Sequence, residues 1–397
     1  MLKSPSVRFP EFDEVWSHTK AGEVFSNSRE RGEEKLPIYS VTLNRGMVPR
    51  SDLTRKMQGD ASFDKNLKVL KGNVAYNMMR MWQGAVGVAP KDCMVSPAYV
   101  VLNPNNDNVS EFFVQWFSLD RMLNLLTVYS RGLTSDRLRL YYEDFAQITI
   151  RVPSAKEQTK IAEFLGAVDE KIHLLEARNE QLALCKKAMM QKFFAQAIRF
   201  KREDGGDFPD WKERKFNEVL KEHKLKSTGK EKVHSVSVHK GVIDQIKHLG
   251  RSFAAANTDH YNRVLPGDVI YTKSPTGDFP YGIIKQSKLE IDAIVSPLYG
   301  VFTPETKALG KILNDYFLSV QNTNNYLRPI IQKGAKNTIN ITNTTFLSRS
   351  LTLPVSQKEQ QKIADFLSAI DDKIDAVGHQ VAQMRCFKKG LLQQMFV

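Results

Sequence analysis

The chain has 397 residues, and its 57 Lys and Arg against 44 Asp and Glu give a formal net charge of +13. This length predicts two or three domains, and a hydrophobic content of 42% can fill their cores, which excludes a wholly disordered chain. No run of about 18 apolar residues occurs, which excludes a transmembrane helix, and the N-terminus lacks the apolar core of a signal peptide, so we expect a cytosolic protein.

The net charge indicates which class of partner the chain binds, and the spacing of the cysteines indicates whether they form disulfides or bind a metal. A surplus of positive charge favours an anionic partner, with nucleic acid first and an anionic membrane surface second. The three cysteines, Cys93, Cys185 and Cys386, are isolated in the sequence. Such cysteines fit buried free thiols rather than a disulfide framework or a zinc site.

Residues 1–155 are predicted to form a first globular domain of strands and loops. Residues 36–43 alternate like a half-buried strand and lead into a polar, glycine-bearing loop, a second loop follows the strand at 69–76, and a third lies near 130–137. Cationic and amide side chains on such loops can reach phosphates and base edges, although a solvated surface position is an equal alternative for any single residue. The candidate DNA-binding residues are Asn44, Arg45, Arg50, Asn77, Arg80, Trp82, Gln83, Arg131, Ser135 and Arg137.

Residues 156–198 are predicted to form a long helix. Apolar residues recur there at alternating spacings of four and three, which is the pattern of a coiled-coil seam. The seam positions are Ile161, Leu165, Val168, Ile172, Leu175, Asn179, Leu182, Lys186, Met189 and Phe193. Asn179 and Lys186 interrupt the apolar run, as the matched Lys388 does in the second long helix, and these residues would fix the register or mark where the two helices separate.

Residues 199–357 are predicted to form a second globular domain with the same order of strands and loops. Residues 233–239 alternate like a strand before a polar loop, and two further loops follow. The candidate DNA-binding residues of this domain are His239, Lys240, Lys273, Ser274, Thr276, Tyr281, Lys333, Lys336 and Asn337.

Residues 358–397 are predicted to form a second long helix. Its seam positions are Ile363, Leu367, Ile370, Ile374, Val377, Val381, Met384, Lys388, Leu391 and Met395. Gly378 lies inside this helix, where glycine costs about 1 kcal/mol relative to alanine. Because the chain alternates domain and helix, an antiparallel helix pair is the natural arrangement, and it would relate the two halves by a pseudo-twofold axis. The expected fold is therefore α+β, with two globular domains alternating with the two paired helices.

The two halves are a tandem repeat. A shift of 202 positions aligns residues 156–194 with 358–396, and 17 of these 39 pairs are identical. Upstream, residues 69–76 match 264–271 and residues 9–12 match 208–211. Helices that stay alike suggest docking to a common partner, while domains that differ suggest two different targets. The candidate docking residues are Lys156, Glu157, Gln158, Lys358, Glu359 and Gln360.

The positive charge lies in the globular segments. The first globular segment has a net charge of +3, the second has +8, and each helix has +1. This distribution disfavours a basic membrane-binding helix and fits two DNA-binding heads joined by nearly neutral helices.

No credible catalytic centre is visible in the sequence. Nucleotide-binding fingerprints, a nucleophile elbow and closely spaced metal-ligating histidines do not occur. Asp169 with Lys171, and Asp371 with Lys373, resemble a nuclease cluster, but charged residues beside an apolar seam are expected there without any catalytic role.

The repeat resembles the specificity subunit of type I restriction–modification systems. The resemblance is carried by KEQTKIAEFLGAVDEKI and KEQQKIADFLSAIDDKI, by the Phe-Pro entry to each domain, by Val-Leu-x-Gly-x-Val-x-Tyr and by Val-Ser-Pro. It implies two target recognition domains that each read one half of a bipartite, asymmetric DNA site, and helices that set the spacing.

The resemblance also implies the partners and cofactors. Two modification subunits would carry S-adenosylmethionine and methylate adenine, while motor/nuclease subunits would use ATP and magnesium, so that this chain would hold no cofactor or metal and no catalytic site. Two alternatives remain open: a coiled-coil adaptor that binds DNA without sequence preference, and a nuclease that uses the two aspartate–lysine clusters.

Overall fold

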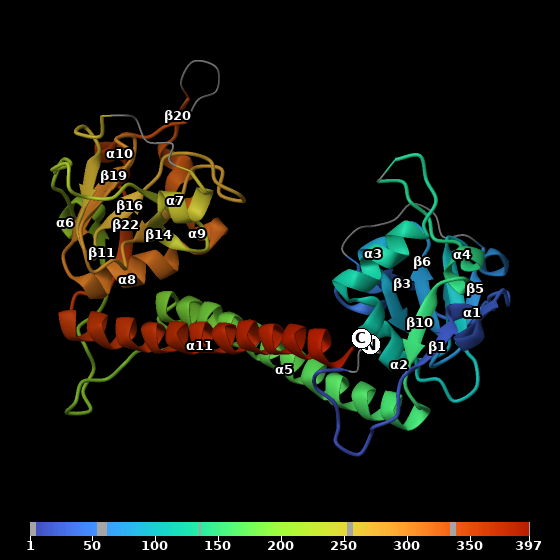
Figure 1. The fold of residues 1–397 in the computed structure, drawn as a ribbon. Helices are drawn as coiled ribbons and strands as arrows, with labels where there is room; N and C mark the ends of the chain where they lie inside the picture. The colour runs from blue at the N-terminus through green and yellow to red at the C-terminus, as the bar shows by residue number, and fades with distance from the viewer. Residues whose placement is uncertain (1–4, 54–61, 135, 252–256, 334–338, 397) are drawn as a thin grey trace. The chain divides into compact units, whose positions relative to one another are not determined.

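The chain divides into two compact units that each hold a globular head and half of each long helix. The computed structural model describes residues 5–53, 62–134, 136–251, 257–333 and 339–396. Unit 1 comprises Met1–Arg178 and Val377–Val397, and unit 2 comprises Asn179–Ala376. We call the part of unit 1 that precedes the first long helix head 1, and the part of unit 2 between the long helices head 2 (Figure 1).

Head 1 is built on a four-stranded antiparallel sheet in the order β2-β9-β6-β7, with the two-stranded ladders β1-β10, β3-β4 and β5-β8 around it. Its strands are β1 (Ser17–Lys20), β2 (Phe25–Ser28), β3 (Tyr39–Thr42), β4 (Gly46–Pro49), β5 (Leu67–Val69), β6 (Val74–Asn77), β7 (Val86–Val88), β8 (Cys93–Val95), β9 (Tyr99–Pro104) and β10 (Thr149–Val152). Its helices are α1 (Ala21–Val24), α2 (Ser110–Phe117), α3 (Asp120–Val128) and α4 (Tyr142–Ala146), with the 3-10 turns η1 (Arg50–Asp52), η2 (Phe63–Lys65) and η3 (Met81–Gln83).

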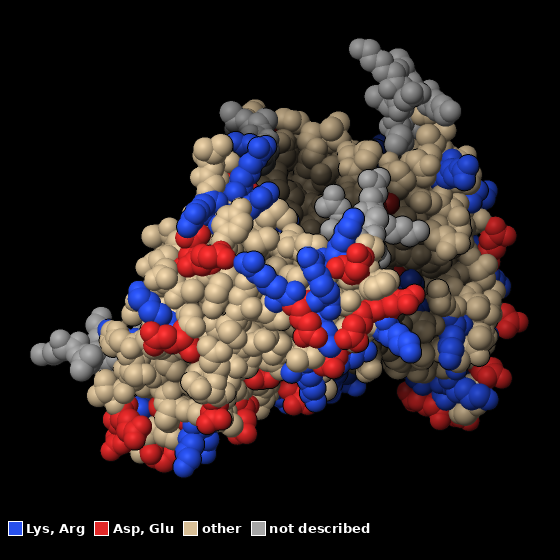
Figure 2. Space-filling view, turned by 90° about the vertical axis from the view of Figure 1, so that its right-hand side faces the viewer, with Lys and Arg blue, Asp and Glu red and all other residues tan. Residues whose placement is uncertain are grey.

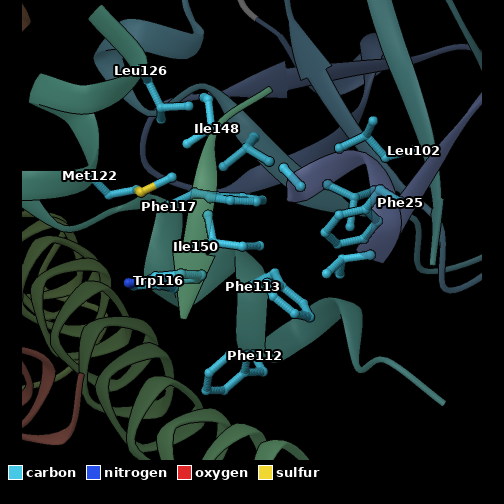
Figure 3. Close-up of a cluster of buried hydrophobic side chains, with 14 of the residues drawn as sticks. Phe25, Leu102, Phe112, Phe113, Trp116, Phe117, Met122, Leu126, Ile148 and Ile150 are labelled. Atoms are coloured by element: carbon cyan, nitrogen blue, oxygen red, sulfur yellow. The ribbon is translucent and has the colours of Figure 1, made fainter. Parts of the chain in front are cut away.

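The central strand β6 separates two hydrophobic clusters in head 1. Because successive side chains of a strand point to opposite faces, Val74 and Tyr76 enter the cluster under α2, and Ala75 enters a second cluster with β3, β5 and β8. The first cluster is rich in aromatic side chains, among which Phe25 and Phe113 pack edge to face with ring centroids 5.0 Å apart. Figure 3 shows these side chains between the strands and α2.

Head 2 repeats this plan with the sheet β12-β19-β16-β17 and the ladders β11-β22, β13-β14, β15-β18 and β20-β21. Its strands are β11 (Lys212–Lys215), β12 (Leu220–Glu222), β13 (His234–Ser237), β14 (Gly241–Asp244), β15 (Asn262–Val264), β16 (Val269–Tyr271), β17 (Ile284–Gln286), β18 (Ala293–Val295), β19 (Gly300–Pro304), β20 (Gln332–Lys333), β21 (Ile339–Asn340) and β22 (Ser350–Leu353). Its helices are α6 (Phe216–Val219), α7 (Gln245–Leu249), α8 (Lys307–Tyr316), α9 (Val320–Leu327) and α10 (Asn343–Leu347), with the 3-10 turn η4 (Arg328–Ile330).

The entry segments of the two heads correct one detail of the repeat. Phe9 and Phe208 are equivalent, since Lys160 lies over the first ring at 5.5 Å and Lys362 over the second at 5.7 Å. Trp211, however, directly precedes β11, and the residue that directly precedes β1 is Trp16. The ungapped match of 9–12 with 208–211 is therefore wrong at its last position, because head 1 has four more residues in this segment.

The two long helices, α5 (Ala155–Phe194) and α11 (Gln357–Met395), pack antiparallel within each unit. In unit 1, the Asp169 carboxylate lies 2.6 Å from Lys388 Nζ and Glu176 lies 2.5 Å from Arg385 Nη2. In unit 2, Lys186 Nζ lies 2.6 Å from the Asp371 carboxylate, and the Phe193 and Phe366 rings are 5.9 Å apart. In both units, residues further along α5 contact residues earlier in α11, as expected for an antiparallel pair.

The predicted seam is confirmed, because every seam position on both helices is buried or half-buried. The lysines that interrupt the seam pair with aspartates of the opposite helix, and the pairs Lys186–Asp371 and Lys388–Asp169 correspond under the shift of 202. These two matched ion pairs thus fix the register of α5 against α11. Fixing the register is one of the two roles that the sequence predicted for the residues that interrupt the seam. Among the described residues, no helix combines the length and apolarity needed to cross a membrane.

The C-terminal end of α11 packs firmly into unit 1. Met395 and Phe396 are buried in the aromatic cluster of head 1, where the Phe396 ring lies 5.1 Å from Phe112 and 6.3 Å from Trp16. Unit 2 has the equivalent contact between Phe194 and Trp211, at 5.6 Å. A phenylalanine at the end of α5, and one directly after α11, thus each pack against the tryptophan that precedes the first strand of a head.

The cysteine prediction is partly wrong. Cys93 is buried in β8 of head 1, and its burial raises the pKa of the thiol to about 12. Cys185 and Cys386 are exposed on the long helices, because both lie on helix faces away from the seam.

Candidate DNA interface

The first candidate loop joins β3 to β4 in head 1 and β13 to β14 in head 2. Both turns end at a glycine with positive φ, +58° at Gly46 and +66° at Gly241, a conformation that other residues adopt at a cost. Two residues before each glycine stand Asn44 and His239, which are both exposed. Arg45 and Lys240 directly precede the glycines and are exposed as well, whereas Arg50 is half-buried at the start of η1.

The second candidate loop follows the central strand, between β6 and β7, in head 1. The Asn77 carboxamide oxygen accepts a hydrogen bond from the backbone N of Met79, and Trp82 Nε1 donates to the Met79 carbonyl at 2.9 Å. These two side chains therefore shape the loop from within. Arg80 and Gln83 are exposed and available for contacts.

The equivalent loop in head 2, between β16 and β17, is built differently. Lys273 has φ of +56°, and partial burial lowers the pKa of its amine. The Ser274 hydroxyl donates to the Thr272 carbonyl and the Thr276 hydroxyl to the Ser274 carbonyl, while the Tyr281 carbonyl accepts from Tyr271. The same place in the two heads thus presents different side chains on different backbones.

The third candidate loop is the hairpin between α3 and α4 in head 1 and between η4 and α10 in head 2. Arg131 is exposed but forms an ion pair with Asp144, while Arg137 is exposed. Ser135, Lys336 and Asn337 lie outside the described residues. Lys333 belongs to β20, and its side-chain environment is likewise outside the description.

The three loops of head 1 lie close together. Strand β4, which leaves the first loop, packs against β7, which leaves the second. The 3-10 turn η3 of the second loop packs against α3, and the backbone N of Leu140 at the foot of the third hairpin donates to the Met78 carbonyl. In head 2, β14 packs against β17 in the same way. Residues that are far apart in the sequence thus gather in one region of each head.

A cleft of about 380 Å³ in head 1 was missed by the sequence analysis. Arg29, Arg31, Tyr99 and Tyr141 are among the residues that line it, and guanidinium and phenol side chains are suited to phosphates and bases. The strand pairings place Lys224, Lys226 and Tyr299 at the equivalents of Arg29, Arg31 and Tyr99. The signal was present in the repeat, since these positions keep their cationic or aromatic character in both copies.

The charged groups on one face of the molecule are seen in Figure 2. Lys and Arg are interspersed there with Asp and Glu across a largely uncharged surface. No large patch of a single charge sign is seen on this face among the described residues.

Four of the six candidate docking residues are buried, which corrects their expected role. Glu157 is 1% exposed and forms a bidentate ion pair with Arg8, and Glu359 is 0% exposed and forms the same pair with Arg199. The amides of Gln158 and Gln360 donate to the carbonyls of the prolines before each helix. These residues tie each helix to its own head, which explains their identity between the copies, and of the six only Lys156 and Lys358 are exposed.

The carboxylates of the nuclease-like clusters serve as counterions of the seam lysines. Asp169 accepts from Lys388 at 2.6 Å and from Gln115 at 2.7 Å. Burial opposes ionisation of Asp371, but hydrogen bonds from Lys186 and Lys311 lower the pKa of this carboxyl below its ordinary value. Lys171 and Lys373 are exposed and are not the partners of these ion pairs.

Two heads with one scaffold and different exposed loops indicate a two-headed nucleic-acid-recognition protein. The family model "Type I restriction modification DNA specificity domain" matches the chain twice, over residues 10–184 and 210–383. The chain belongs to this family, and it is a DNA-recognition subunit of the type I restriction–modification class.

Named relatives and solved structures agree with this membership. The MjaVIII type I restriction enzyme specificity subunit of Methanocaldococcus jannaschii is 23% identical over 84% of this chain and 82% of its own, and the putative MjaX specificity subunit of the same organism is 22% identical over 74% and 69%. The crystal structure of the type I S subunit from M. genitalium superposes with a TM-score of 0.60 at 13% identity, covering 100% of this chain and 99% of that one. This last similarity concerns the fold.

Proposed function

We propose that each head reads one half of a bipartite, asymmetric DNA site, and that the helix pair sets the spacing between the halves. The proposal is supported by loops that have the same backbone geometry in the two heads but carry different side chains. Asn44 and Arg45 stand where head 2 has His239 and Lys240, on turns of the same geometry. One scaffold with two sets of exposed hydrogen-bonding groups is what recognition of two different half-sites requires.

The helix pair, by contrast, supports a role in spacing and assembly. Its ends are tied to the heads by the buried Glu157–Arg8 and Glu359–Arg199 pairs, and its register is locked by the two lysine–aspartate pairs. We propose that the outward faces of the helices bind two modification subunits, because the repeat presents the same surface twice. S-adenosylmethionine would then belong to those subunits, and ATP and magnesium to motor/nuclease subunits.

The test is reconstitution with the modification subunit, followed by mapping of methylated adenines. We expect no methylation by the chain alone and methylation at a bipartite motif by the complex. Exchanging head 2 for the head of a related chain should change one half of the motif and leave the other half and the spacing intact. A motif that is unaffected by the exchange would refute the proposal.

The two alternatives have tests of their own. A non-specific adaptor would lose its DNA to random competitor at physiological salt, whereas a specific reader would keep its site. A nuclease would lose cleavage on Asp169→Ala and Asp371→Ala. The ion pairs of both carboxylates with seam lysines support a structural role instead.

A further inference from the structure

A fully exposed leucine stands on the third hairpin of head 1. Leu133 is 102% exposed, the largest value among the exposed large apolar side chains of the described residues, and the next is Val128 at 78%. The hairpin lies between α3 and α4 and rises clear of the rest of unit 1 (Figure 1). Single exposed leucines are common on protein surfaces, but this one stands on a fastened hairpin that also carries arginines.

The backbone of the hairpin is closed by hydrogen bonds. The backbone N of Arg131 donates to the Arg139 carbonyl and the N of Arg139 to the Arg131 carbonyl, both at 2.8 Å. Beside Leu133, a Cβ on Gly132 would stand 2.6 Å from the Arg137 carbonyl oxygen, so the two sides of the hairpin touch there. These contacts fix the two sides of the hairpin next to Leu133, which lowers the entropic cost of binding there.

The foot of the hairpin is fastened to the core of head 1. Leu140 is 0% exposed, and its backbone N donates to the Met78 carbonyl at 2.9 Å. Arg131 forms an ion pair with Asp144 on α4, and the Ser130 hydroxyl donates to the Leu126 carbonyl at 2.7 Å. The projection is therefore braced on both sides.

The hairpin that carries Leu133 has more cations than anions. Arg131, Arg137 and Arg139 are exposed on it, against the one exposed carboxylate of Asp136 among its described residues. Arginines at such positions can hold DNA phosphates, and an apolar side chain carried between them can enter a groove and separate two stacked base pairs. An exposed apolar side chain on a hairpin fastened at its foot, with arginines before and after it in the sequence, fits that role better than it fits a polar readout of base edges.

We propose that Leu133 is a wedge that opens a base step in the half-site read by head 1. The proposal rests on the proposed function and deepens it, because it assigns part of the specificity of head 1 to DNA deformability as well as to hydrogen bonds. Sequences whose base step unstacks easily would then bind better than sequences that match only the directly contacted bases.

The experiment uses the complex of this chain with its modification subunit on its mapped site. 2-Aminopurine replaces in turn each adenine of the head 1 half-site other than the methylated one, since its fluorescence rises when the base unstacks and a methyltransferase unstacks its own target base without any wedge. We expect a rise at one position with the natural chain and its loss with Leu133→Ser, together with about tenfold weaker specific binding. Leu133→Met should restore both, and the substitutions leave the fold intact because the side chain is wholly exposed.

The matched control is Ile291→Ser, which removes another exposed apolar side chain, 69% exposed, from head 2. It should leave the fluorescence of the head 1 half-site and the affinity unchanged. If Leu133→Ser behaves like the control, or if no position brightens with the natural chain, the wedge is wrong while the proposed function stands. If the natural complex binds without sequence preference, the proposed function fails and the wedge fails with it.

Discussion

At the residue scale, the two heads differ at single positions on a common turn. The turns that end at Gly46 and Gly241 carry Asn44 with Arg45 in one head and His239 with Lys240 in the other. Both cations are exposed, but a guanidinium can contact guanine through two parallel hydrogen bonds, whereas an ammonium acts as a point charge. The same geometry can therefore give different base preferences.

Substitution of these two cations should affect one half-site each. Arg45→Ala should weaken discrimination in the head 1 half-site by about 1–3 kcal/mol if the side chain reads a base. Lys240→Ala is the matched variant and should act on the other half-site. Binding of the complex to sites with single base changes measures both effects. Uniform weakening over all sequences, with a smaller salt dependence, would instead identify a phosphate contact.

At the element scale, α5 and α11 are held by ionic contacts of unequal burial. Lys186 in unit 2 contacts both Asp371 and Asp315, and its side chain is 9% exposed. Lys388 in unit 1 contacts Asp169, with 21% and 42% exposure for the two partners. Matched positions of the repeat thus hold one buried and one partly solvated ion pair.

Removal of the two lysines should therefore have unequal costs. Lys186→Met should lower the stability of unit 2 by about 3 kcal/mol, because Asp315 and Asp371 would lose a buried counterion. Lys388→Met should cost about 1 kcal/mol or less, because water screens that pair. Thermal unfolding of the two variants compares them directly, and equal losses would contradict the difference in burial.

Lys285 makes the stability of unit 2 depend on pH. It is 5% exposed on β17, and burial lowers the pKa of its amine to about 8, while Asp315 opposes the shift and Lys186 and Lys288 add to it. Between this pKa and the ordinary value near 10.5 the unfolded chain binds more protons, so stability rises with pH through this window and is lost as pH falls through 8.

Lys285→Met should remove this dependence. It leaves two lysines and two aspartates, Lys186, Lys311, Asp315 and Asp371, as a balanced buried cluster. The variant should be more stable than the natural chain by about 3 kcal/mol at pH 7, and this difference should shrink to about 1 kcal/mol at pH 10. Urea unfolding at both pH values measures the difference, and a gap that does not change with pH would refute the assignment to Lys285.

At the scale of the whole molecule, each unit is assembled from distant parts of the chain. Unit 1 needs the last twenty-one residues, since Met395 and Phe396 fill the cluster that contains Trp16 and Phe112. The first and last segments are also joined directly, because the backbone N of Val7 donates to the Gln394 carbonyl at 3.1 Å. The C-terminus is therefore a structural part of the first head.

Phe396→Ala should consequently destabilise unit 1, although the residue is next to the chain end. Loss of a buried phenylalanine costs about 3–5 kcal/mol. Phe194→Ala, the matched variant of unit 2, should cost less, because Phe194 is only half-buried beside Trp211 and Tyr316. Limited proteolysis would show which unit opens first, and an unaffected unit 1 would refute the role of Phe396.

Much of the fold follows from local sequence patterns. The spacing of Ile161 to Phe193 and of Ile363 to Met395 predicts the helix pair, because a period of 3.5 residues leaves one continuous apolar stripe that must be covered. The repeat predicts that both heads share their strands. These inferences need neighbours along the chain and a comparison of the chain with itself, and nothing more.

The candidate site could be predicted only as a set of loops. Asn77 and Trp82 are candidate DNA contacts, and the structure adds that both also hydrogen-bond within their own loop. Whether a polar side chain turns inward depends on the backbone groups that the folded loop leaves unpaired, and the composition of the loop does not reveal these.

By itself, the sequence determined the tandem repeat, the seam, the surplus of cations in the heads and the family. The tertiary structure alone decided that Glu157 and Glu359 are buried against Arg8 and Arg199, that Phe396 completes the first head, and that Leu133 is fully exposed. The apolar period of the long helices and the identities between the two repeat copies indicate which positions are structurally constrained. They do not indicate which residue contacts a given side chain, because folding brings together residues that are far apart in the sequence. The Ser6 hydroxyl, for example, donates to the carbonyl of Gln394, 388 positions away.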